Sequence, residues 1–414
     1  MSKNTMGALQ LSGLIVGAVL GSGIVLLPPI AQAQLGTWAI MGWVIILSLG
    51  AVFAGVFAKL ALAFPGSEGV PIAVREAFGP RAGQLVSNYI ICAVLCGPVA
   101  VLMTAADTIA RTFNWPFESL PLISGGLLCV CAILLMRRVT VIGTVSLLAS
   151  IGIGVVLLAG SVTTIALSPE VPWPDSRLDL SIMGRTLLVL FWAIIGWEII
   201  GNYSMEVRDP KRSVPQATAL GVSAICIIYF LVAWALYCGG HTGEAVSVAD
   251  VVRPLLGSAS KAVIMVITVV LCLCTFIMII GGISRLIATL AGVGKLPGVL
   301  AYKTASGAPV AALGTLFSVH LINMVLLYFQ YITLEQLLAF ANVFFLANSL
   351  VAILAAMYLF PSIFFRISCA FLCSGFVLLL VFSSLWPLLM VAGVTVFTCI
   401  RAGHKSVNPV TERH

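Results

Sequence analysis

Two short sequences interrupt long apolar segments of this chain. One is Gly21-Ser22-Gly23-Ile24, and the other reads Phe191-Trp192-Ala193-Ile194-Ile195-Gly196-Trp197-Glu198. Interrupting a helix frees N–H groups at the start of one half and C=O groups at the end of the other. The freed N–H groups favour an anion, and the freed C=O groups accept hydrogen bonds from a cation. The chemistry predicted for these segments is therefore the binding of a zwitterion by backbone groups.

The positions of the two interruptions favour binding over packing. Taken alone, Gly21 and Gly23 are equally typical of helices that pack closely through small residues. However, the first interruption lies midway along the first apolar segment, and the second lies midway along the sixth. These segments open two halves of five helices each. Paired interruptions of this kind point to a midplane site in transporters built from inverted repeats.

Glu198 is the most deeply placed carboxylate in the apolar segments. A carboxylate inside a membrane is costly, which makes it a functional candidate. Three roles are open for it: a neutral protonated acid, a carrier of a coupling proton, or a hydrogen-bond partner that stabilises the interrupted backbone. Trp192 is a candidate gate over a bound substrate, with core filling as the alternative. Asp107 and His320 lie away from both interruptions and are interpreted as structural.

The composition requires a lipid environment. The chain has 414 residues, of which 61% are hydrophobic and 8% are charged, whereas a soluble domain carries about 25% charged residues. The net charge of +7 comes from basic residues in short loops between apolar segments, so a nucleic-acid face is not expected. The eleven cysteines lie in or beside apolar segments without zinc-type spacing, and packing is the preferred interpretation.

An enzyme is disfavoured because no catalytic cluster is present. The sequence contains no H-E-x-x-H, no G-x-S-x-G and no P-loop, and it has no paired intramembrane aspartates. No cofactor and no metal are expected. The first charge-free stretch, between Lys3 and Lys59, is too long for a removable signal peptide.

The elements that position the interrupted segments are predicted to be about twelve transmembrane helices in an all-α integral membrane fold. A spanning helix needs about 20 mainly apolar residues. The expected helices cover 7–33, 38–63, 83–110, 119–136, 141–167, 183–205, 214–239, 261–290, 309–329, 334–359 and two within 362–400, separated near Ser383–Pro387. The loops 168–181 and 240–259 are interpreted as solvated connectors with at most a short surface helix.

The distribution of basic residues predicts the orientation. With the N-terminus in the cytoplasm, sixteen Lys and Arg residues fall on the cytoplasmic side and five on the other. Cytoplasmic loops carry an excess of Lys and Arg. The pattern therefore predicts a multi-pass protein of the inner or plasma membrane with both termini in the cytoplasm.

Several motifs resemble the amino acid–polyamine–organocation (APC) superfamily. Gly21-Ser22-Gly23-Ile24 is similar to its helix 1 signature, Phe64-Pro65-Gly66-Ser67-Glu68-Gly69 to the segment after helix 2, and the stretch from Trp192 to Pro215 to helix 6 and the loop that follows. Ser284-Arg285-Leu286, Gly294-Lys295-Leu296-Pro297 and Gly307-Ala308-Pro309 resemble the region of helices 8 and 9. The length is similar to that of bacterial methionine and branched-chain amino acid exporters. Glu68 stands where glycine is common in the family.

The resemblance implies a LeuT-like bundle of 5+5 helices in inverted repeats, with helices 1 and 6 unwound. Residues 1–414 would form one transporter domain, with repeats at about 7–168 and 181–360 and two extra helices at about 362–401. It implies that Ser22, Gly23 and Ile24 hold the substrate carboxylate, that the helix 6 backbone at Phe191, Ala193 and Ile194 meets the ammonium, and that Trp192 is the gate.

The predicted substrate is a neutral, apolar amino acid. No deep carboxylate other than Glu198 is available to pair with a cationic side chain. The predicted pocket walls are Ile24, Ile194, Ile195, Trp197, Val99 and Met103. The predicted function is secondary active transport by alternating access, as exporter or exchanger, with a coupling proton or counter-substrate. The alternative is an antiporter of amines, polyamines or basic amino acids. Helix 5 has no Lys, and Ser146, Ser150 and Thr275 are interpreted as backbone-bonded rather than as a sodium site.

Overall fold

The computed structural model describes residues 6–66, 68–136, 139–168, 177–239, 247–304 and 307–405. Within these residues the chain is helical throughout, and the only β-type contact is an isolated parallel bridge between Met6 and Val207. The long helices are α3 (Ala39–Ala63), α5 (Pro80–Phe113), α6 (Leu120–Leu135), α7 (Val139–Leu167), α10 (Pro210–Cys238), α12 (Ser260–Gly292), α13 (Val310–Tyr328), α14 (Leu334–Leu359), α15 (Ile363–Val381) and α16 (Leu385–Lys405). The shorter ones are α1 (Ala8–Leu20), α2 (Gly23–Leu35), α4 (Val70–Phe78), α8 (Leu180–Leu190), α9 (Ile200–Tyr203) and α11 (Val248–Leu256).

Nine helical stretches in the described part of the chain are long and apolar enough to cross a membrane. Three shorter apolar helices cover Ala8–Leu20, Leu180–Ile194 and Leu385–Ile400. The first two of these belong to the segments that the sequence predicts to be interrupted. Large apolar side chains such as Leu122 and Phe364 are about four-fifths exposed, at 81% and 80%. An outer surface of this kind suits lipid, and the prediction of a multi-pass membrane protein is confirmed.

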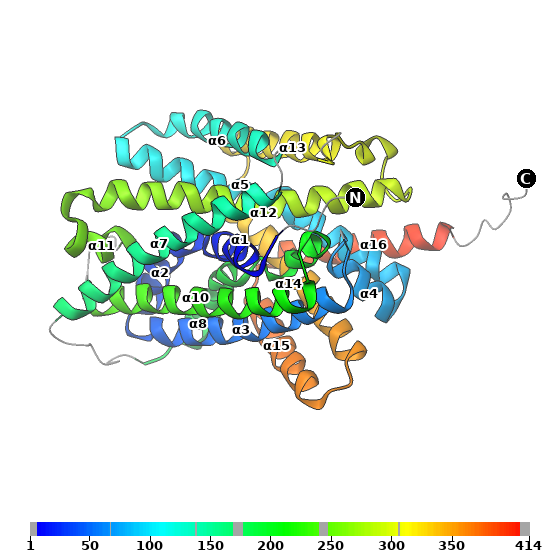
Figure 1. Ribbon diagram of the computed structural model, residues 1–414, viewed down its shortest axis with the longest axis horizontal. Helices are drawn as coiled ribbons and strands as arrows, with labels where there is room; N and C mark the ends of the chain where they lie inside the picture. The colour runs from blue at the N-terminus through cyan, green and yellow to red at the C-terminus, as the bar shows by residue number, and fades with distance from the viewer. Residues whose placement is uncertain are drawn as a thin grey trace, which may run out of the picture.

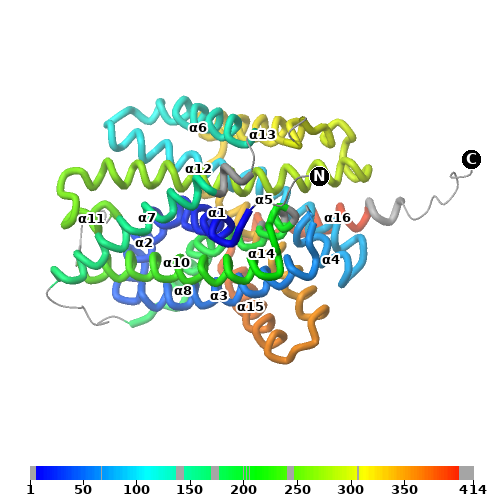
Figure 2. The backbone as a smooth tube through the Cα atoms, viewed as in Figure 1, coloured from blue at the N-terminus to red at the C-terminus, as the bar shows by residue number. Residues whose placement is uncertain are grey.

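The helices form one bundle around the two interrupted segments. Most long helices run along the horizontal axis of the view in Figure 1, and α1 lies near its centre. Helix α1 packs against α7, α10 and α12, while α5 packs against α12 and α14. The tube in Figure 2 shows α6 and α13 side by side at one edge of the bundle and α15 at the opposite edge. Helix α1, the first interrupted helix, is therefore surrounded by continuous helices.

The expectation for the loop 240–259 is corrected in its described part. Helix α11 buries Val248, Val251 and Val252 completely or nearly so. It packs against α7 at Gly160, where a Cβ atom would lie only 2.6 Å from a Val252 methyl carbon. The apolar face of α11 thus joins the bundle core instead of lying in solvent. Residues 169–176 of the other loop lie outside the described residues.

A proline explains the buried histidine of α13. Pro98 lies inside α5 and lacks an N–H group, so the carbonyl of Val94 loses its helical partner. Nε2 of His320 lies 2.9 Å from that oxygen, and Nδ2 of Asn323 donates to the carbonyl of Leu95 at 2.7 Å. Because a carbonyl oxygen only accepts, Nε2 of His320 carries the hydrogen. This arrangement agrees with the structural role expected for His320.

Candidate functional site

The first interruption separates α1 from α2. Helix α1 ends at Leu20, and α2 begins at Gly23. Between them Gly21 has φ 37° and ψ −139°, a conformation that residues with a Cβ rarely adopt. Ser22 is the residue before α2, and no side chain caps the start of this helix. The first amides of α2 are therefore available to an external acceptor.

The second interruption lies after α8. A 3₁₀ turn covers Phe191–Ile194, Ile195 is extended, and Gly196 has φ 122°. A second 3₁₀ turn, Trp197–Ile199, then leads into α9. Glycine is needed at position 196 because side chains rarely tolerate this backbone conformation. The helix is thus interrupted within the segment that the sequence indicates.

The two interruptions meet at a small cavity. Its walls come from α1, α2, the 3₁₀ turn after α8, and α12; the lining residues are Ala18, Val19, Gly21, Ser22, Gly23, Trp192, Ile195, Thr275 and Ile279. Nε1 of Trp192 donates a hydrogen bond to Oγ of Ser22 at 3.2 Å. Segments about 170 residues apart in sequence are joined by this bond. Among the described residues that line this cavity, none has an ionisable side chain.

Trp192 lines the cavity and also contacts the continuous helices α5 and α12. Its indole packs against Val101 of α5 and Cys272 of α12. A Cβ atom on Gly97 of α5 would lie 3.4 Å from the ring, which is ordinary contact. The indole is therefore in a position to cover the cavity, and its role as a gate stays a prediction.

Several other predicted residues are buried nearby without lining this cavity. Phe191 packs edge-on against Phe376 of α15, with ring centroids 5.2 Å apart. The side chain of Ile194 packs against Gly50 of α3, where it is the closest group to the position of a Cβ atom. Trp197 packs in the same way against Gly221 of α10. Of the six predicted wall residues, Ile24, Ile194, Ile195, Trp197, Val99 and Met103, only Ile195 lines the cavity. The segment Phe191–Ile194 faces the cavity through Trp192, and Ala193 is buried.

Sequence reasoning missed part of the wall that α12 and α1 supply. Ile279, Ala18 and Val19 line the cavity but resemble any other apolar residue of a spanning helix. Thr275 lines it as well, and its hydroxyl donates to the carbonyl of Ala18 at 2.7 Å. A regular spacing of four residues, Thr275 to Ile279, is the only sequence signal that these two share a helix face.

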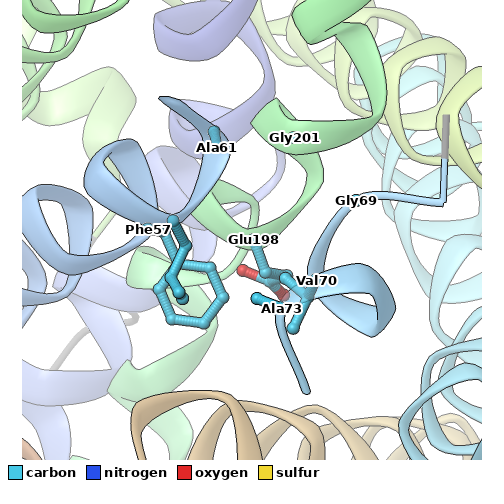
Figure 3. A pocket seen from close by; sticks show the side chains of 8 residues that line it. Phe57, Ala61, Gly69, Val70, Ala73, Glu198 and Gly201 are labelled. Atoms are coloured by element: carbon cyan, nitrogen blue, oxygen red, sulfur yellow. The ribbon is translucent and has the colours of Figure 1, made fainter. Parts of the chain in front are cut away.

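Glu198 lies at a separate cavity, not at the first one. Figure 3 shows its carboxylate among Phe57 and Ala61 of α3, Gly69, and Val70 and Ala73 of α4. Oε2 accepts a hydrogen bond from the backbone N–H of Gly196 at 3.0 Å, and Oε1 has no partner among the described residues. The side chain is 1% exposed, so this oxygen is sealed from water. Glu198 thus accepts from a backbone amide at the interruption, and its role stays a prediction.

The remaining polar candidates each have a partner. Ser146, interpreted from the sequence as backbone-bonded, donates instead to Sγ of Cys274 at 3.4 Å. Arg111 pairs with Asp107 at 2.7 Å near the end of α5, where both side chains are largely exposed. The hydroxyl of Ser150 donates to the carbonyl of Gly13 at 3.2 Å. Glu68 pairs with Arg75 of α4 at 2.9 Å, which gives this departure from the family pattern a structural role.

No metal site is evident in the part of the chain that the structure describes. No group of three or more His, Cys, Asp or Glu side chains there is close enough to bind an ion. The eleven cysteines are all free thiols.

Comparison with known proteins identifies the family. The family model described as "Amino acid permease" matches residues 6–399. An uncharacterized amino acid permease of Bacillus subtilis is 27% identical over 70% of this chain and 69% of its own length. The L-methionine/branched-chain amino acid exporter of Escherichia coli is 24% identical over 95% of both chains. The cadaverine/lysine antiporter of Escherichia coli is 30% identical over 55% of this chain and 52% of its own.

These relatives are transporters rather than enzymes, and the resemblance to the APC superfamily is confirmed over nearly the whole chain. The chain belongs to the amino acid permease family.

Proposed function

We propose that the protein is a secondary active transporter that moves neutral, apolar amino acids across the inner or plasma membrane by alternating access. The observation that carries this proposal is the cavity where two interrupted helices meet without an ionisable side chain in its wall. The proposed architecture is one LeuT-like domain of twelve helices, with inverted repeats at about 7–168 and 181–360 and two further helices at about 362–401. Both termini would lie in the cytoplasm.

In the proposed complex, backbone groups hold both charges of the amino acid. The amides at Ser22, Gly23 and Ile24 would donate to the carboxylate, because the start of α2 has no side-chain cap and carries the positive end of a helix dipole. The carbonyls of Phe191, Ala193 and Ile194 would accept from the ammonium. Trp192 would cover the substrate and release it when the outer or inner path opens.

A neutral side chain fits this cavity better than a cationic one. The lining residues offer apolar groups, glycines, one indole and two hydroxyls. The nearest buried carboxylate, Glu198, lies at the other cavity and already accepts from Gly196. An unpaired cation buried here would carry a large desolvation cost. The exporter of methionine and branched-chain amino acids, which aligns with this chain over 95% of its length, supports the same choice.

The alternative is an antiporter of amines, polyamines or basic amino acids. The cadaverine/lysine antiporter and an arginine/agmatine antiporter of Chlamydia felis, 27% identical over 56% of this chain, favour it. Both matches cover about half of each protein, at 52% and 51% of the relatives' length. In either case Glu198 is the candidate for a coupling proton, and a counter-substrate is the other candidate for coupling.

Transport assays on proteoliposomes containing the purified full chain test the proposal. We expect saturable uptake of labelled methionine and leucine that unlabelled neutral amino acids inhibit. Trp192→Ala should lower this flux about tenfold or more, which corresponds to a loss of about 1.4 kcal/mol. Trp386→Ala is the matched control, because Trp386 of α16 stacks on Phe340 instead of facing the cavity. Equal flux in all three proteins would contradict the site.

Inhibition by cadaverine or agmatine, but not by leucine or methionine, would support the alternative. An absence of any saturable flux would contradict both transport proposals for these substrates.

A further inference from the structure

The last turn of α1 presents a bonding problem inside the membrane. The final four C=O groups of a helix have no partner within the helix. For α1 these belong to Gly17, Ala18, Val19 and Leu20. Water is scarce at this depth and each unpaired carbonyl is costly, so the partners of these four oxygens define what holds the interruption open.

Each of the four carbonyls has a partner in the structure. Gly17 accepts from the backbone N–H of Gly21 at 3.3 Å, and Ala18 accepts from the Thr275 hydroxyl at 2.7 Å. The carbonyls of Val19 and Leu20 share one donor, the hydroxyl of Tyr229 in α10, at 3.4 and 3.2 Å. A single side chain of α10 is therefore the donor to two of the four carbonyls at the end of α1.

Tyr229 is held firmly in this position. Its side chain has no exposure to solvent, and its ring stacks on Trp43 of α3 with centroids 4.8 Å apart and planes 24° from parallel. Stacked rings of this kind add to the energy of simple burial. The hydroxyl is thus presented by two continuous helices, α3 and α10, which do not depend on the interrupted helix for their own shape.

The same hydroxyl also lies against the other side of the interruption. A Cβ atom on Gly23, the first residue of α2, would lie 2.4 Å from the Tyr229 oxygen. The small size of Gly23 is therefore required by Tyr229 and not by its backbone conformation, which is helical. The Tyr229 oxygen therefore contacts the end of α1 and also leaves no room for a side chain at the first residue of α2.

We propose that Tyr229 is a positioning residue for the substrate site. Its hydroxyl fixes the Val19 and Leu20 carbonyls and the approach of Gly23, and so aims the first amides of α2 at the cavity. The inference rests on the proposed function, in which these amides bind the substrate carboxylate. Tyr229 itself lies outside the lining of the cavity.

Tyr229→Phe tests the role in transport. The variant keeps the ring and its stacking on Trp43 but removes the hydroxyl. We expect KM for the neutral amino acid to rise about tenfold while the maximal rate stays within about twofold, since the amides bind less well but the bundle is intact. The matched control is Tyr89→Phe, which removes a buried hydroxyl bonded to Thr395 at 2.5 Å, between α5 and α16. An equal KM in the two variants would overturn the proposal.

A double-variant cycle tests the geometry without any transport. Gly23→Ala should lower the melting temperature of the purified protein by several degrees, because its new methyl group would overlap the hydroxyl. In the Tyr229→Phe background the same substitution should cost less than about half as much, since residues in contact are not additive. An equal cost in both backgrounds would overturn the contact. If wild-type flux is absent, the proposed function fails, and this cycle still decides the position of Tyr229.

Discussion

The two interrupted helices find hydrogen-bond partners for their freed backbone groups by different means. After α8 the solution is local: Gly196 adopts φ 122°, and its N–H donates to Glu198 two residues further on. After α1 the solution is distant: the Ala18 and Leu20 carbonyls accept from Thr275 and Tyr229, which belong to other helices. The second interruption is therefore stabilised by residues of its own segment, whereas the first depends on how α10 and α12 pack against α1.

This difference also separates the two cavities. The cavity at Ser22 is lined by Thr275, one of the two donors to the end of α1, whereas the cavity at Glu198 adjoins α3 and α4. A Cβ atom on Gly201, just beyond Glu198, would lie 3.1 Å from the α carbon of Gly69. The local interruption is thus closely linked to the loop before α4.

The largest expected effect comes from Gly196→Ala. A Cβ atom at φ 122° is strained and would lie 3.2 Å from a Val19 methyl carbon, so the carbonyls of Phe191–Ile194 would be redirected. Backbone strain of this kind costs about 1–3 kcal/mol, and we expect flux to fall to about a tenth or less. Flux in proteoliposomes and elution as a single species after purification are the measurements. Gly314→Ala in α13 is the control, because a Cβ atom there meets nothing within 4 Å. Normal flux in Gly196→Ala would show that transport does not require the backbone conformation of Gly196.

An intermediate effect is expected at Glu198. Glu198→Ala leaves the Gly196 N–H buried without an acceptor, and we expect a loss of about 1–3 kcal/mol in stability. Glu198→Gln keeps an acceptor oxygen and should melt close to the wild type. Thermal melts in detergent compare the three proteins.

The same pair of variants separates two roles of Glu198. If this residue carries a coupling proton, Glu198→Gln abolishes accumulation driven by a pH gradient and retains exchange of labelled for unlabelled substrate. Unchanged accumulation in Glu198→Gln would leave only the structural role.

The smallest effect is expected from Thr275→Val. The substitution removes the donor to the Ala18 carbonyl, and side-chain hydrogen bonds between membrane helices contribute about 0.6 kcal/mol on average. Thr268→Val in the same helix is the control, because its hydroxyl donates within α12, to the carbonyl of Ile264 one turn earlier. We expect a lower melting temperature and a higher KM for Thr275→Val than for Thr268→Val. Identical values for both would mean that α12 does not help to hold the first interruption.

Local sequence signals predicted the elements well. Runs of apolar residues marked the helices, and glycine at 21 and 196 marked the interruptions, because backbone conformations with positive φ leave few alternatives. The sequence likewise indicated that His320 is structural, although the reason, the carbonyl left free by Pro98, needed the position of α13 against α5.

Side-chain directions were harder to predict. Ile194 and Trp197 were expected at the substrate cavity but are the nearest neighbours of Gly50 and Gly221. The unwound turn after Leu190 has neither helical nor extended periodicity, so spacing does not say which side chains point inward. Helices that are apolar all round also lack the polar face that separates core from surface in soluble proteins.

The sequence by itself determined that this protein needs a lipid environment, that it is built from long apolar helices, and where two of its helices are interrupted. These follow from composition and from backbone preferences, which act within a few residues. Only the tertiary structure decided that Glu198 lies apart from the cavity at Ser22 and that the Tyr229 hydroxyl of α10 donates to the end of α1. Hydrogen bonds between helices depend on which faces meet, and in an apolar chain that choice is made by packing.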